Sequence, residues 1–96
     1  MSDAGDISIL NNGAESRFEA VVDGLLCVAD YEIKEGLMVF THTFVPAELR
    51  GRGVAGKLVR AALAEARAKH FKVIPACSYV ARFIDRHKEY ADLLAS

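Results

Sequence analysis

The sequence has no tryptophan, only two cysteines and two prolines, and no long apolar run. A membrane-spanning helix needs about 20 consecutive, mostly apolar residues, which excludes a helical membrane protein. The polar start, residues 1–6, lacks the charged-then-apolar build of a signal peptide. We therefore expect a cytoplasmic protein that does not bind membranes. In a chain without a leader, Cys27 and Cys77 are expected to be free thiols.

No close spacing of cysteine and histidine suggests a metal site, so none is predicted. The net charge is only −1, but it is unevenly distributed. Residues 1–36 hold eight acidic side chains against two basic ones, and residues 50–72 hold seven basic side chains against one acidic one. A local positive field suits an anionic ligand, and the same charges also suit a solvated helix face. Charge alone leaves both interpretations open.

The first half of the 96-residue chain predicts four strands joined by short turns. They are expected at residues 7–10, 17–22, 25–34 and 37–45, from apolar runs and from alternation of apolar and polar residues. Asn11-Asn12-Gly13 is expected to close the first strand. Asp23-Gly24 predicts a type I′ hairpin turn, which needs positive φ at both central residues. Simple alternation places His42 on the same face as Phe40 and Phe44.

The second half predicts helices around one short strand. Pro46 ends the fourth strand, because it cannot donate a backbone hydrogen bond. An apolar stripe of period 3.6 predicts a helix from Val54 to Lys69. Residues 72–76 predict an edge strand, Ser78 is expected to cap a helix to about Arg86, and a short helix follows. The sequence thus predicts one α+β domain, residues 1–96: an antiparallel meander, a βαβ unit and a C-terminal helix.

Residues 50–58, Arg-Gly-Arg-Gly-Val-Ala-Gly-Lys-Leu, satisfy three phosphate-binding patterns at once. These are the dinucleotide fingerprint Gly51-x-Gly53-x-x-Gly56, most of a Walker A loop at Gly51-x-x-x-x-Gly56-Lys57, and the acetyltransferase loop Arg50-x-x-Gly53-x-Ala55. In all three, small residues admit phosphate to the free N–H groups at the start of a helix. An ordinary glycine-rich turn between a strand and a helix is the alternative.

Context separates the three patterns. A Walker A loop needs Ser or Thr after its lysine, and Leu58 stands there. A dinucleotide fold needs the loop after its first strand and an acid about 20 residues later, and residues 73–77 contain none. Only the acetyltransferase pattern expects an antiparallel meander before the loop and a single strand after it.

Three further segments strengthen this interpretation. They are His42-Thr43-Phe44-Val45-Pro46 with Leu49-Arg50-Gly51-Arg52-Gly53, then Val73-Ile74-Pro75-Ala76-Cys77-Ser78-Tyr79-Val80, then Arg86-His87-Lys88-Glu89-Tyr90. With them the chain resembles small, single-domain GNAT-like N-acetyltransferases over about residues 17–94. Ser78 and Lys88 stand where that group usually has proline. The group lacks the helices that usually build an acceptor site in larger GNAT enzymes.

The resemblance implies acetyl-coenzyme A as the ligand. It implies contacts to coenzyme A from Val45, Arg50, Gly51, Arg52, Gly53, Val54, Ala55 and Tyr79. The loop would hold the pyrophosphate, and Val45 would offer backbone hydrogen bonds to the pantetheine arm. For Cys77 it implies a place near the thioester, as proton donor or acetyl acceptor; an inert buried thiol is the alternative. His42 is either a general base or a core histidine.

We therefore expect transfer of an acetyl group to an unknown amine, on a small molecule or a protein. The alternative is a non-catalytic module that binds coenzyme A thioesters. Nucleic-acid binding is not expected, because the basic segment carries no interleaved aromatic residues and the pI is only about 6.3. A monomer or a weak homodimer is expected.

Overall fold

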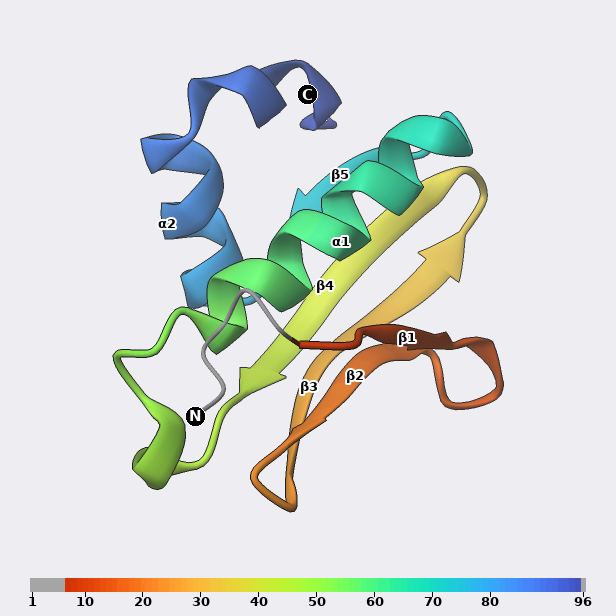
Figure 1. The fold of residues 1–96 in the computed structure, drawn as a ribbon. Helices are drawn as coiled ribbons and strands as arrows, with labels where there is room; N and C mark the ends of the chain where they lie inside the picture. The colour runs from red at the N-terminus through yellow and green to blue at the C-terminus, as the bar shows by residue number, and fades with distance from the viewer. Residues whose placement is uncertain (1–6, 96) are drawn as a thin grey trace.

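The structure is a computed structural model that describes residues 7–95, so the expectation drawn from residues 1–6 falls outside this range. Its strands are β1 (Leu10–Asn12), β2 (Arg17–Val22), β3 (Leu25–Lys34), β4 (Leu37–Phe44) and β5 (Lys72–Pro75), and its helices are α1 (Val54–Ala68) and α2 (Ser78–Arg86). Three 3₁₀ segments are η2 (Gly13–Glu15), η3 (Ala47–Leu49) and η4 (Lys88–Leu93). The strands form one sheet in the order β1-β2-β3-β4-β5, with only the β4–β5 pair parallel (Figure 1). The predicted meander, βαβ unit and C-terminal helix are confirmed.

Tight turns set the register of the meander. Between β2 and β3, Asp23 has φ 52° and Gly24 has φ 77°, so both central residues have the positive φ that a type I′ turn requires. Glu35 and Gly36 repeat this pattern between β3 and β4, with φ 50° and 82°. The predicted hairpin at Asp23-Gly24 is confirmed.

One predicted boundary is wrong. The first strand begins at Leu10 and continues through Asn11 and Asn12, which were expected to form the turn. Their side chains explain the difference, since Asn11 accepts a hydrogen bond from the Tyr31 hydroxyl at 2.7 Å and Asn12 accepts one from the Glu15 N–H at 3.3 Å. At the other end of the chain, the predicted short last helix is present as the 3₁₀ segment η4.

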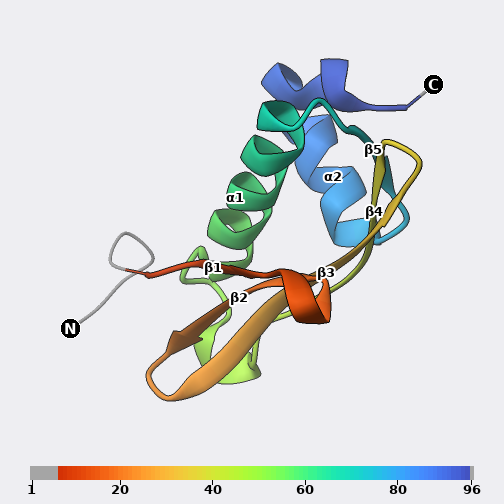
Figure 2. The same ribbon diagram turned by 90° about the vertical axis from the view of Figure 1, so that its right-hand side faces the viewer.

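Both helices lie on the same face of the sheet (Figure 2). The hydrophobic core fills the space between the helices and the sheet. The buried side chains of α1 are Val54, Leu58, Val59, Ala62, Leu63 and Ala66, and those of α2 are Val80, Phe83 and Ile84. They meet the inward side chains of β2, β3 and β4 in one cluster. The opposite face is open and carries Val21, Leu26 and Phe44, which are 66%, 43% and 44% exposed.

A β-bulge in β4 changes which residues face the helices. Tyr31 pairs with Phe40, whereas Asp30 pairs with His42, so Thr41 is an extra residue. An extra residue shifts the alternation by one. His42 is therefore exposed on the open face and Thr43 turns toward the helices, which makes the predicted placement of His42 beside Phe40 wrong.

The C-terminal segment pairs with the outer face of α1. Arg67 lies 2.8 Å from a carboxylate oxygen of Asp92, and Arg60 lies 3.8 Å from one of Glu89. Arg60 and Arg67 thus lie on a solvated face of α1 and pair with acidic side chains there. The basic segment, residues 50–72, therefore does not present one continuous positive surface. None of the helices within residues 7–95 has the length and hydropathy that a membrane span requires.

Candidate functional site: a pocket between β4 and two helix starts

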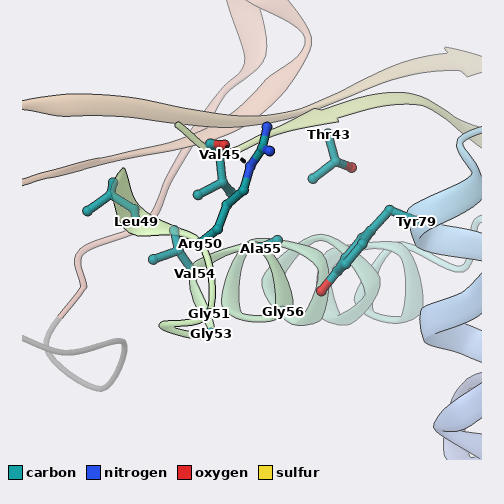
Figure 3. Close-up of a pocket in the computed structure, with 10 residues that line it drawn as sticks. All are labelled: Thr43, Val45, Leu49, Arg50, Gly51, Gly53, Val54, Ala55, Gly56 and Tyr79. Carbon is teal, nitrogen blue, oxygen red and sulfur yellow. Dashed lines mark hydrogen bonds between the residues drawn. The ribbon is translucent and has the colours of Figure 1, made fainter. Parts of the chain in front are cut away.

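A pocket of about 430 Å³ opens where the end of β4, the glycine-rich loop and the start of α2 meet (Figure 3). Its lining residues are Thr43, Val45, Leu49, Arg50, Gly51, Gly53, Val54, Ala55, Gly56 and Tyr79. Small-molecule pockets commonly span about 300–1,000 Å³ and combine apolar walls with a few polar groups. The structure thus gathers into one cavity every residue predicted to contact coenzyme A except Arg52.

The pocket exists because β4 and β5 separate. Their pairing ends at Phe40 and Pro75, and the chain then turns so that the Cys77 N–H donates to the Phe40 carbonyl at 2.9 Å. The remaining residues of β4 have no strand partner on this side within the part of the chain that the structure describes. An open strand edge presents backbone groups to an extended ligand.

The glycine-rich loop delivers the start of α1 to the pocket mouth. Gly51 and Gly53 have φ 85° and 79°, a region that side chains with a Cβ rarely adopt. Gly53 is the N-cap of α1 and contributes no side-chain cap. The first N–H groups of this 15-residue helix, at Val54 and Ala55, are therefore suited to bind an anion.

The two arginines of the loop differ. The Arg50 side chain crosses the pocket (Figure 3), and its Nε donates to the Val45 carbonyl at 3.1 Å. Arg52 lies outside the lining residues, where its guanidinium meets an Asp23 carboxylate oxygen at 2.9 Å. Arg52 thereby ties the loop to the β2–β3 turn.

Cys77 lies next to the pocket, in contact with the lining residue Thr43. It is half-buried, is not itself a lining residue, and has its Sγ 3.6 Å from Thr43 Oγ1. Burial raises the pKa of the Cys77 thiol, but hydrogen bonds from the Val80 backbone, the Thr43 hydroxyl and the Tyr79 backbone outweigh burial, so the net pKa is lowered. Such a shift favours a reactive thiolate.

The start of α2 differs from the prediction in one respect. Cys77 is the N-cap and Ser78 is the first helical residue, so the expected Ser78 cap is wrong. The reason is that the Cys77 N–H is engaged by Phe40, which holds Cys77 in an extended conformation. Cys27, by contrast, is fully buried, and burial raises the pKa of its thiol. Both thiols are free.

Of the two remaining predicted site residues, Tyr79 lines the pocket and His42 does not. Tyr79 reaches from α2 toward α1 (Figure 3), and burial raises its pKa, with Arg86 acting against the rise. A Cβ at Gly56 would lie 3.8 Å from the Tyr79 hydroxyl, which is an ordinary van der Waals contact, so the approach of Tyr79 does not require glycine there. No cluster of His, Cys, Asp or Glu suited to a metal occurs among residues 7–95.

Sequence reasoning assigned no role to Thr43, Leu49 or Gly56. All three lie inside the motifs quoted above, and Gly56 belongs to both rejected glycine patterns. Thr43 adjoins His42 in the His-Thr signature, so the signal was present but was attributed to the neighbouring residue.

Comparison with known proteins identifies the fold and the family of the chain. The NMR solution structure of a GCN5-like candidate N-acetyltransferase from Staphylococcus aureus superposes with a TM-score of 0.75 at 27% identity, covering 100% of this chain and 92% of that one. The fold is therefore GNAT-like. A family model described as GCN5-related N-acetyl-transferase matches residues 17–93. The chain belongs to the GCN5-related N-acetyltransferase family.

Proposed function

We propose that this protein binds acetyl-coenzyme A in the pocket and transfers the acetyl group to an amine. One observation carries the proposal: the uncapped start of α1 and the unpartnered edge of β4 open into the same cavity. An anion-binding helix start suits a pyrophosphate, and a free strand edge suits an extended chain of amides. Coenzyme A combines both features, and use of acetyl-coenzyme A is general in the family.

Different residues of the pocket would bind the phosphates and the pantetheine arm of coenzyme A. Gly51 and Gly53 leave room for phosphate oxygens at the N–H groups of Val54 and Ala55. The Val45 carbonyl, at the end of the free edge, would accept a hydrogen bond from the pantetheine arm. Arg50 holds that carbonyl in the free protein, so binding would release its guanidinium toward the phosphates.

When bound, acetyl-coenzyme A supplies an acetyl group activated as a thioester. The acceptor nitrogen would form the new C–N bond as the C–S bond breaks, and the proton that it loses would restore the proton on Cys77 Sγ. Backbone N–H groups would polarise the carbonyl oxygen. Cys77 holds a proton at Sγ that the departing sulfur needs, and the start of α2 stabilises the thiolate left behind. Alternatively, Cys77 Sγ itself accepts the acetyl group and passes it to the amine.

Calorimetry with acetyl-coenzyme A, ATP and NAD, followed by a transfer assay on a panel of amines, tests the proposal. We expect binding of the thioester and transfer to at least one class of amine. Tight binding of ATP or NAD with none of the thioester would overturn it. Binding without transfer to any amine would favour the non-catalytic coenzyme A-binding module.

Substituting Cys77 separates the enzyme from the binder. Cys77→Ser should lower the transfer rate by roughly 10²-fold, the usual scale for a proton-transfer group, and Cys77→Ala by at least as much. Affinity should stay within a few-fold, because the phosphate-binding groups lie on α1. Wild-type rates in both variants would show that Cys77 only packs.

A further inference from the structure

Thr43 is the polar side chain through which Cys77 reaches the pocket. Three side chains with hydrogen-bonding groups line the cavity, and they belong to Thr43, Arg50 and Tyr79. Among these, Thr43 contacts the sulfur, with its Oγ1 3.6 Å from Cys77 Sγ. Thr43 is half-buried, so solvent competes only partly for this hydroxyl.

The bulge at Thr41 creates this contact. Without the extra residue, the alternation of β4 would turn His42 toward the helices and Thr43 toward the open face. With it, Asp30 pairs with His42 and Ala29 pairs with Thr43. Because Ala29 is fully buried beneath the helices, its partner Thr43 faces inward as well. Bulges often re-aim a side chain next to a functional site.

Thr43 supplies the side-chain hydroxyl within hydrogen-bond distance of the sulfur, and it donates when Cys77 is a thiolate, because a thiolate has no proton to give. The Cys77 N–H is held by the Phe40 carbonyl, which fixes the residue, and backbone groups of Tyr79 and Val80 at the start of α2 face the sulfur. The nearby ionisable side chains in the pocket wall are Arg50 and Tyr79. Of the three polar side chains that line the pocket, Thr43 is the one whose polar atom lies 3.6 Å from the Cys77 sulfur.

We propose that Thr43 is a positioning residue whose hydroxyl donates a hydrogen bond to the Cys77 sulfur, stabilises its thiolate and aims it at the pocket. The use of that thiolate rests on the proposed acetyl transfer, but the hydrogen bond belongs to the ligand-free protein. Thr43 therefore contributes to the chemistry through Cys77, and not by touching the acetyl group.

The test is the pH dependence of Cys77 alkylation by iodoacetamide in the ligand-free protein, with peptide mapping to separate it from Cys27. Thr43→Val keeps the shape and removes the donor, whereas Thr43→Ser keeps the donor. A hydrogen bond to a charged group changes an ionisation equilibrium by roughly tenfold. We therefore expect Thr43→Val to slow alkylation near neutral pH roughly tenfold and to move its midpoint upward, and Thr43→Ser to restore the wild-type profile.

Ser78→Ala is the control, because it removes an exposed hydroxyl from the residue that follows Cys77 and leaves the bulge of β4 intact. It should leave the alkylation profile unchanged. A wild-type profile in Thr43→Val, or in Thr43→Ala should the valine variant fail to fold, overturns the inference. Failure of coenzyme A binding would not affect this assay, so the two proposals fail separately.

Discussion

At the scale of single residues, Ala55 offers the sharpest test of where the phosphates bind. It lies in the first turn of α1 and lines the pocket. Ala55→Glu places an acid where the helix dipole favours it, so the fold should remain stable. The new charge would repel a pyrophosphate by about 1–4 kcal/mol at close range, and calorimetry should show acetyl-coenzyme A affinity at least tenfold lower.

Ala64→Glu is its control, since Ala64 is an exposed residue of the same helix outside the pocket. It introduces the same charge without approaching the ligand and should leave affinity within about twofold. Equal affinity in the wild type and in the Ala55→Glu protein would place the phosphates elsewhere.

His42 yields a prediction in the opposite direction. The bulge leaves it exposed on the face of the sheet that the helices do not cover. His42→Ala should therefore leave acetyl transfer unchanged within about twofold and leave the melting temperature nearly unchanged, as most exposed substitutions do. A pH–rate profile that loses a limb near neutrality in this variant would restore His42 as the general base.

At the scale of elements, the loop before α1 depends on glycine for its backbone. A Cβ at Gly51 would meet no atom within 4 Å, yet the residue has φ 85°. The cost of Gly51→Ala is therefore conformational, about 1–2 kcal/mol, which corresponds to roughly 4–15 °C of melting temperature in a domain of this size. Thermal unfolding measures it.

Gly13→Ala is the comparison, because its Cβ would also meet open space and Gly13 has no positive φ. It should stay within about 0.5 kcal/mol of the wild type. Equal melting temperatures in the two variants would show that the loop relaxes without its left-handed conformation.

The elements also show what the sequence could predict. Alternation located β2 and β3, and the 3.6-residue period located α1, because each pattern reports burial on one face. Alternation could not reveal the bulge, because nothing in the sequence of β4 marks Thr41 as an extra residue. The bulge becomes visible only in the pairing of β4 with Asp30 and Tyr31 of β3. The asparagines of β1 were likewise assigned by their usual turn preference, whereas the Tyr31 hydroxyl holds Asn11 in a strand.

In the candidate site, too, local sequence patterns were predictable and contacts between distant residues were not. The loop from Arg50 to Ala55 was predictable, because phosphate binding needs small residues in a fixed order along the chain. The direction of Arg52 was not, since its partner Asp23 lies 29 residues away in the sequence. The contact between Thr43 and Cys77 was hidden for the same reason, because it joins the end of β4 to the N-cap of α2, 34 residues later in the sequence.

At the scale of the whole molecule, charge is divided between the two ends of α1. At its C-terminal end, Arg67 is matched by Asp92 and Lys69 by Glu65. At its start, Arg50 and the helix N–H groups face the pocket without an acidic lining residue. An anionic ligand therefore finds its favourable potential at the pocket.

The same division predicts how ligands change the stability of the folded protein. A ligand that binds only the native state at 100 times its Kd stabilises it by about 2.7 kcal/mol, or on the order of 10–20 °C in melting temperature for a domain of this size. Acetyl-coenzyme A should produce such a shift. ATP and NAD should produce less, because they carry phosphates for α1 but no pantetheine arm for the edge of β4. Ala55→Glu should reduce the shift by about half or more, as its at least tenfold lower affinity requires, and Ala64→Glu should keep it, which ties the stabilisation to the pocket. Differential scanning fluorimetry over a series of ligand concentrations measures all five shifts. A shift with ATP as large as with the thioester would reduce the site to a general phosphate-binding loop.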